Sequence, residues 1–144
     1  MVIDTSALVA IRQNEPERRH FNEAIEEVES CSISSATLVE ASIIIESRYG
    51  SLGLGDHDLL VSKAEITVVP VDLDQALIAR QAFSRYGKGR HPAGLNHGDC
   101  FSYALAKSLG QSLLQKGADF VRTDLIIHPA GQNSESTLDS RSIE

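Results

Sequence analysis

Three acidic residues stand where a short apolar segment gives way to a predicted helix. Asp4 follows "MVI", Glu40 lies in "SATLVEASIII", and Asp99 begins "DCFSYALAKSLG". Each acid taken singly is typical of helix capping. Asp4 would be an N-cap, Glu40 would end a capping box that begins at Thr37, and Asp99 would place a negative charge in a first turn. For each single acid, a structural interpretation stays open.

Considered together, the same three acids favour a metal site. Asp4 and Asp99 have apolar neighbours, where an ionised carboxylate is costly unless a partner compensates it. Carboxylates brought close together repel, so one must take up a proton or a cation must lie between them. No Cys or His cluster with metal-ligand spacing accompanies them, so the oxygen-seeking ions Mg²⁺ or Mn²⁺ fit best. The combination predicts a metal-dependent phosphodiester hydrolase.

The elements that must bring these acids together are predicted to alternate between strands and helices. Short strands are expected at residues 1–3, 31–34, 66–71, 112–115 and 125–128, and helices at 4–11, 15–30, 35–50, 52–65, 72–87 and 94–110. In the helix at 72–87, the expected core contacts are Leu73, Leu77, Ala79 and Phe83. Such alternation implies right-handed crossovers and a parallel sheet covered on both faces, whose carboxyl edge gathers functional groups.

Length and composition predict one domain with a true core, since 42% of the 144 residues are hydrophobic. No run of 18 or more apolar residues predicts a membrane span, and the start of the chain lacks the basic segment of a secretory signal. Two cysteines are too few for a disulfide framework. The net charge of −7 argues against broad, non-specific nucleic-acid binding. We expect a domain over residues 1–128, a disordered polar tail over 129–144, no membrane contact and a cytoplasmic location.

Four segments carry a family resemblance. "VIDTSALVAI", "SSATLVEASIIIESRYG", "RYGKGRHPAGLNHGDCFSYALAKSLG" and "LLQKGADF" resemble, in order and spacing, the PIN-domain ribonucleases, and among these the VapC-type toxins of bacterial toxin–antitoxin pairs. The resemblance implies a three-layer α/β/α sandwich with a central, mostly parallel, twisted sheet. It also implies a metal-dependent endoribonuclease that cleaves single-stranded RNA.

The resemblance implies roles for particular acids. Asp4, Glu40 and Asp99 are expected to bind Mg²⁺ or Mn²⁺ directly or through water, and Asp119, from the "DF" pair, to complete the acidic pocket. Either Glu40 or Asp99 would accept the proton of the attacking water. Asp124 is a candidate substitute or outer acid.

Polar and basic neighbours complete the expected site. A hydroxyl shortly after the first acid matches Ser6 better than Thr5. Asn96 is expected either to cap the helix at residues 94–110 or to orient the acids of the pocket without contacting the metal ion. Since phosphate contacts dominate nucleic-acid affinity, RNA contacts are expected from cationic side chains. These are Lys88, Arg90 and Lys116.

The resemblance also implies partners, and two alternative functions stay open beside it. A cognate antitoxin is expected to neutralise the toxin, which would form a homodimer and, with antitoxin, a heterotetramer or larger assembly. Apolar side chains around Leu52, Leu54 and Leu59 are a candidate part of the antitoxin groove. One alternative is a non-catalytic PIN-like module that binds RNA or protein. A second is a haloacid-dehalogenase-type phosphotransferase, which would need a second Asp where this chain has Ser6.

Overall fold

A parallel four-stranded sheet forms the centre of the protein. The structure is a computed structural model that describes residues 1–131. Its strands lie in the order β3-β2-β1-β4, and every pairing is parallel. The bounds are β1 Val2–Ile3, β2 Ser32–Ser34, β3 Thr67–Val69 and β4 Leu113–Leu114. The strands expected near residues 2, 32, 67 and 113 are therefore confirmed, although each is short.

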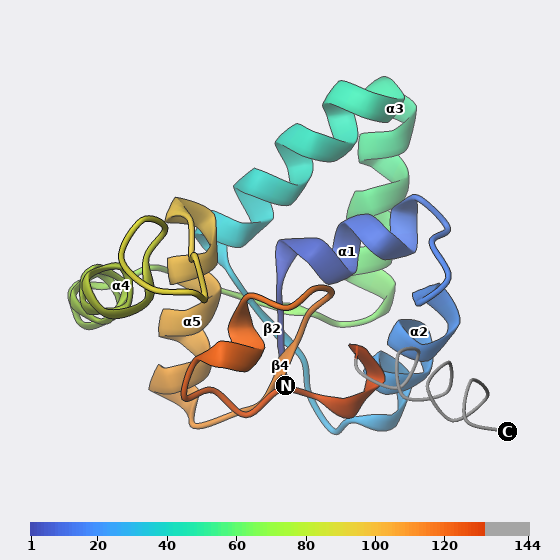
Figure 1. Ribbon diagram of the computed structural model, residues 1–144. Coiled ribbons are helices and arrows are strands. Elements are labelled where there is room, and N and C mark those ends of the chain that lie inside the picture. The colour runs from blue at the N-terminus through green and yellow to red at the C-terminus, as the bar shows by residue number, and fades with distance from the viewer. Residues whose placement is uncertain (132–144) are drawn as a thin grey trace, which may run out of the picture.

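Within residues 1–131, five α-helices and two 3-10 helices surround this sheet. They are α1 Thr5–Arg12, α2 Arg18–Glu27, α3 Ser35–Lys63, α4 Leu73–Tyr86, α5 His97–Leu109, η1 Phe120–Arg122 and η2 Pro129–Gly131. Figure 1 shows α4 and α5 on one side of the sheet, and α1, α2 and the second part of α3 on the other. The expected three-layer α/β/α sandwich is confirmed.

The core is divided by the sheet into two clusters, because successive strand residues point to opposite faces. On β1, Val2 packs with the cluster under α4 and α5, whereas Ile3 packs with the cluster under α1 and α2. On β4, Leu113 and Leu114 are divided in the same way, and all four side chains are fully buried. This burial on both faces explains why the strands read as short apolar runs without polar alternation.

A sharp kink at Gly50 divides α3 into two helical parts. The backbone there has φ 69° and ψ −164°, a conformation open almost only to glycine, so the expected stop at Gly50 is confirmed in its dihedral angles. Figure 1 shows the first part rising away from the sheet and the second descending beside α1. The buried positions of α3 recur every four residues on both sides of the kink. They are Thr37, Ala41, Ile45, Gly53 and His57.

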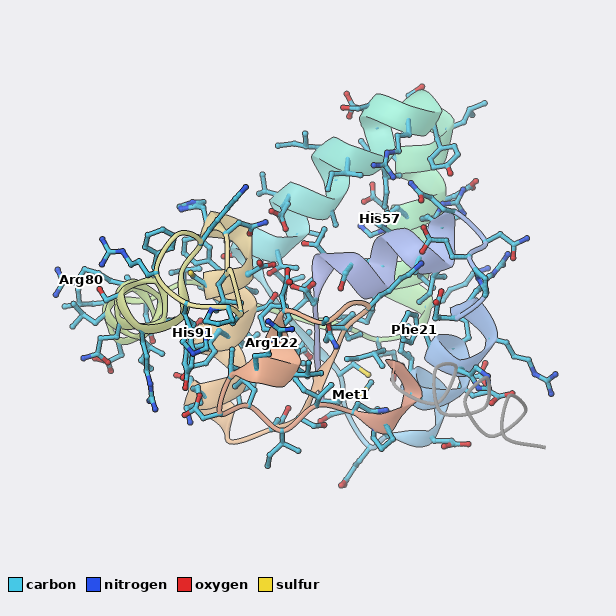
Figure 2. All side chains as sticks on the ribbon, viewed as in Figure 1. Met1, Phe21, His57, Arg80, His91 and Arg122 are labelled. Atoms are coloured by element: carbon cyan, nitrogen blue, oxygen red, sulfur yellow. The ribbon has the colours of Figure 1, made fainter. Side chains whose placement is uncertain are left out.

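The core face of α4 differs from the one expected from the sequence. Leu73, Leu77 and Phe83 are 73%, 39% and 37% exposed, so placing them in the core was wrong, whereas Ala79 is buried as expected. The helix instead packs on α5 through small side chains such as Ala79 and Ala82. Arg80 points away from the body of the molecule (Figure 2). Alanines allow the two helices to approach closely, and Leu73, Leu77 and Phe83 are left exposed, whereas Tyr86 is buried beside Tyr103 of α5.

The chain after β4 contributes little regular structure. The strand expected at 125–128 is reduced to one parallel bridge between Leu113 and Ile127. Beyond it, η2 buries Ala130 against the cluster that contains Phe21, so folded structure continues past the expected boundary at 128. The rest of the predicted tail, 132–144, lies outside the described residues. Within residues 1–131, no helix combines the length and apolar character needed to cross a membrane.

We expect Gly50→Ala to lower the free energy of unfolding by about 1–3 kcal/mol, because alanine is strained at this positive φ although nothing crowds the position. The matched control is Gly55→Ala, at a helical position that is also open. That change should raise the free energy of unfolding by about 0.5–1 kcal/mol, since alanine favours a helix. Urea titrations followed by far-ultraviolet circular dichroism would compare both variants. Equal effects of the two changes would contradict the strained kink.

Candidate active site

Asp4 lies at the junction of β1 and α1 and is held through both carboxylate oxygens. It is the N-cap of α1, and its Oδ2 accepts hydrogen bonds from the Ser6 backbone N (3.0 Å) and the Ser6 Oγ (2.7 Å). Its Oδ1 accepts a hydrogen bond of 2.6 Å from the Ser102 Oγ of α5. The residue is 3% exposed. The capping interpretation is therefore correct for Asp4, but it accounts for only one of the two oxygens.

Glu40 reaches the same region from the second turn of α3. The capping-box interpretation was wrong, because the N-cap of α3 is Ser34, whose side chain accepts from the Ala36 N. Glu40 instead receives a hydrogen bond from the Thr5 hydroxyl of α1. Its carboxylate lies directly against Gly98 on α5, where a Cβ atom would collide with it. Glu40 therefore has a role in the site and none in capping.

Asp99 both caps its helix and faces the other acids. Asn96 is the N-cap of α5, its side chain accepts from the Asp99 N (2.9 Å), and Asp99 Oδ2 accepts from the Asn96 N (3.0 Å). Burial raises the pKa of Asp99 to about 7, opposed by the Asn96 hydrogen bond and reinforced by the charges of Asp4, Asp119 and Glu40. Of the two roles expected for Asn96, the structure shows capping.

An open pocket brings the three acids together at the carboxyl edge of the sheet. It is lined by Asp4, Thr5, Ser6, Val9, Gln13, Glu15, Glu40, Ile44, Arg48, Asn96, Asp99, Lys116 and Gly117. Asp119 is exposed and outside this lining, although it is near enough to raise the pKa of Asp99. Within residues 1–131, no three acidic, His or Cys side chains are close enough to enclose a bare metal ion. The donor set is nevertheless all carboxylate oxygen, which suits a hard cation that keeps part of its water shell.

The cations expected to bind RNA are placed differently from one another. Lys116 lines the pocket, but its ammonium contacts Glu15 and lies 3.3 Å from Glu17, so its charge is already shared. Lys88 and Arg90 are exposed in the loop before α5 and do not line the pocket.

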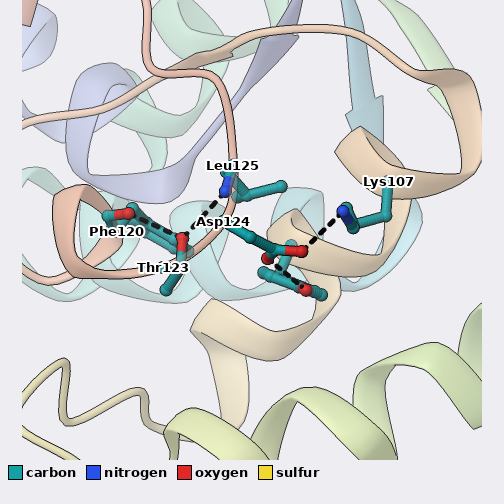
Figure 3. A network of polar contacts seen from close by, with 6 residues as sticks. Lys107, Phe120, Thr123, Asp124 and Leu125 are labelled. Atoms are coloured by element: carbon teal, nitrogen blue, oxygen red, sulfur yellow. Dashed lines mark hydrogen bonds and ion pairs between the residues drawn. The ribbon is translucent and has the colours of Figure 1, made fainter.

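Asp124 is occupied elsewhere and does not join the acidic pocket. Its Oδ1 accepts a hydrogen bond of 2.6 Å from the Tyr103 hydroxyl, and its Oδ2 accepts one of 2.7 Å from Lys107 (Figure 3). Burial alone would raise its pKa, but the hydrogen bonds from Lys107 and Tyr103 lower it to about 2. The structure thus contradicts Asp124 as a substitute acid and assigns it to an ion pair with α5.

Among the residues of the site that the sequence analysis missed, four support the acids or add a cation to the pocket. Ser102 and Thr37 form a buried hydroxyl pair behind Asp4, Gly98 makes room for Glu40, and Arg48 lines the pocket from α3. Only Ser102 carried a local signal, since it lies one helical turn after Asp99 and hence on the same face of α5. The other three depend on contacts between distant segments.

The protein is similar in sequence to known ribonucleases along most of its length. The PIN domain family model matches residues 1–125. Ribonuclease VapC of Mycolicibacterium smegmatis is 53% identical over 125 residues, which cover 87% of this chain and 97% of that protein. Ribonuclease VapC30 of Mycobacterium tuberculosis is 50% identical over 87% of this chain and 95% of its own length.

Solved structures with much lower identity share the fold. VapC20 of Mycobacterium tuberculosis, described as a toxin that cleaves the sarcin–ricin loop, superposes with a TM-score of 0.71 at 15% identity and covers 87% of this chain and 95% of its own. VapBC-1 of nontypeable Haemophilus influenzae gives a TM-score of 0.66 at 20% identity, with coverages of 88% and 95%. The family match, the identity to curated relatives and the shared fold agree, and the chain belongs to the PIN-domain family and, within it, to the VapC ribonucleases.

Proposed function

We propose that this chain is a divalent-metal-dependent endoribonuclease that cleaves single-stranded RNA as the toxin of a toxin–antitoxin pair. The observation that carries the proposal is the convergence of Asp4, Glu40 and Asp99, from three separate elements, on one pocket. Structural capping alone would not require acids that raise the pKa of Asp99 to about 7 through burial and mutual repulsion.

The proposed metal ligands are these three acids, directly or through water, with Asp119 completing the set. Carboxylate oxygens suit Mg²⁺ or Mn²⁺, and Mg²⁺ commonly keeps several water molecules, through which acids that do not contact the ion directly can still bind it. When bound, such a cation lowers the pKa of water and offsets the negative charge of the reacting phosphate.

The chain's own residues supply orientation and proton transfer. Glu40 and Asp99 each have one oxygen engaged by the protein, by Thr5 and by the Asn96 backbone, so either can present the other oxygen to the attacking water. Ser6 orients Asp4.

We assign RNA binding to basic side chains in and around the acidic pocket. Arg48 and Lys116 border the pocket itself, and their proposed contacts are with RNA phosphates there, where the Lys116 ammonium would exchange its contacts with Glu15 and Glu17 for a phosphate. Lys88 and Arg90 lie outside the pocket lining, and their proposed contacts are with phosphates farther along the strand.

A cognate antitoxin is the proposed protein partner, and homodimers, with heterotetramers or larger assemblies in the complex, are the proposed oligomers, acting in the cytoplasm. Leu52 and Leu59 are 84% and 55% exposed on the second part of α3, and Leu54 is half-buried. Apolar side chains presented on one helical segment suit an amphipathic partner helix. Solved structures that share this fold include toxin–antitoxin complexes, which supports an antitoxin as the partner.

Asp4→Asn and Asp99→Asn should each lower RNA cleavage at least about 100-fold, because each removes a carboxylate that the proposed mechanism uses. Cleavage of a single-stranded RNA panel would be measured with Mg²⁺ and with Mn²⁺. Asp74→Asn, in the first turn of α4 and outside the pocket, is the matched control and should leave cleavage unchanged. Wild-type protein that cleaves no RNA with either ion would favour the non-catalytic alternative. An Asp4→Asn variant that cleaves RNA as wild type does would contradict the role proposed for Asp4.

Gly98→Ala should separate stability from activity. Alanine favours the helix by about 1 kcal/mol over glycine, but its Cβ would occupy the position of the Glu40 carboxylate. We expect RNA cleavage to fall at least about 10-fold while far-ultraviolet circular dichroism shows an intact fold. Gly55→Ala, whose added methyl meets nothing, is the control for the helical effect. Full activity of Gly98→Ala would show that the position of Glu40 does not matter.

The stability of the metal-free protein should depend on the protonation of Asp99. Because its pKa in the folded protein is about 7, above the ordinary 3.8, the folded state keeps a proton that the unfolded chain releases. The contribution of Asp99 to the free energy of unfolding therefore falls as the pH rises from about 4 to 7. Asp99→Asn should match wild type near pH 4 and exceed it at pH 8 by about 1–3 kcal/mol, a figure reduced for partial solvent exposure.

Urea titrations between pH 4 and 8 would measure this difference, with Asp74→Asn as the control that should show little pH dependence relative to wild type. Added Mn²⁺ should reduce the advantage of Asp99→Asn at pH 8, because a cation offsets the same repulsion. A constant difference between Asp99→Asn and wild type across the pH range would contradict the raised pKa.

A further inference from the structure

Behind Asp4 lies a chain of two buried hydroxyl groups that connects three elements. The Ser102 Oγ on α5 donates to Asp4 Oδ1 at 2.6 Å, and the Thr37 Oγ1 on α3 lies 3.2 Å from the Ser102 Oγ. Ser102 and Thr37 are each 1% exposed. In residues 1–131 these are the only hydrogen bonds of the Ser102 hydroxyl.

The direction of this chain follows from the number of available protons. An ionised carboxylate only accepts hydrogen bonds, and a serine hydroxyl has one proton to donate. Since Ser102 gives its proton to Asp4, the hydrogen bond between the two hydroxyls must be donated by Thr37. The order Thr37 to Ser102 to Asp4 polarises each hydroxyl toward the carboxylate, which strengthens the bond that Asp4 receives.

Packing alone does not explain the pair. An alanine would fill most of the volume of Ser102 without placing a polar group in the core. The carboxylate of Asp4 is almost buried, and Ser6 donates only to Oδ2, so without Ser102 the Oδ1 atom would have no donor from the described residues. The carboxylate would then be held by Ser6 through Oδ2 alone, and its orientation about the terminal bond would be less restricted.

We infer that Ser102 is a positioning residue that fixes the orientation of Asp4 for a divalent cation, and that Thr37 acts one step behind it. This inference rests on the proposed metal-dependent nuclease function. Groups that orient a ligand carboxylate from behind influence metal affinity strongly, because they set which lone pairs remain for the ion. The pair also ties α3, which carries Glu40, to α5, which carries Asp99, so two buried hydrogen bonds link the elements that carry the three acids.

Titration of the purified RNA-free protein with Mn²⁺, followed by electron paramagnetic resonance of the unbound ion, tests the inference without relying on catalysis. Ser102→Ala should weaken Mn²⁺ binding at least about 10-fold. Thr37→Val keeps the shape and the direct donor to Asp4, and it should weaken binding less, in the same direction. Ser47→Ala removes a hydroxyl that bonds only within α3, to Ile43 O at 2.7 Å, and should leave Mn²⁺ binding unchanged.

The outcomes separate this inference from the proposed function. If wild type cleaves RNA and both Ser102→Ala and Thr37→Val bind Mn²⁺ as wild type does, the inference is overturned and the nuclease proposal stands. If Ser102→Ala weakens Mn²⁺ binding but wild type cleaves no RNA, the inference holds and the nuclease proposal fails. If the circular dichroism spectrum shows that Ser102→Ala is unfolded, the Thr37→Val variant tests the inference. Weaker Mn²⁺ binding by Thr37→Val then supports the inference, and unchanged binding refutes it.

Discussion

Repulsion among carboxylates that the fold does not allow to separate governs the carboxyl edge of the sheet. Asp4 directly follows β1, an inner strand of the sheet, so it cannot move away from α5 without breaking β1 from its neighbours. Burial and the nearby charges then raise the pKa of Asp99 to about 7. The chain offsets this cost with neutral donors from Ser6, Ser102 and Thr5, and these donors hold the acids in fixed orientations. The three acids of the pocket are therefore kept close together in spite of this cost.

Much of this arrangement could be predicted because it depends on local patterns. Each strand is an apolar run between turn or helix signals. Because strands that alternate with helices pair in parallel, their carboxyl ends meet at one edge of the sheet. Asp4 and Asp99 were located correctly for this reason, and the capping box of Asn96 and Asp99 is itself a local sequence pattern. Glu40 also lies at this edge of the sheet, as expected. Its interpretation as part of a capping box was wrong, because the N-cap of α3 is Ser34, three residues before Thr37.

The features that could not be predicted depend on which helix faces and side chains from distant segments pack against each other. Helical spacing marks several possible faces on α4, and only the close approach of α5 selects Ala79 and Ala82 over Leu73 and Leu77. From the sequence, Asp124 was a candidate outer acid of the site. In the structure, its carboxylate forms an ion pair with Lys107 of α5 instead. Gly98 shows the same limit, because its importance arises from a side chain 58 residues earlier in the sequence.

The kink at Gly50 has a consequence for insertions and deletions in this chain. At about 100° per residue, positions 37 and 57 would lie on nearly opposite sides of a straight helix, yet both are buried here. The kink rotates the second part of α3 relative to the first. The first part can therefore present Glu40 to the pocket while the second part buries His57 and packs on α1. A single codon gained or lost between Glu40 and Gly50 would rotate everything beyond it by about 100° and expose His57 in place of its neighbours. The ten-residue spacing is thus as constrained as the residues at its two ends.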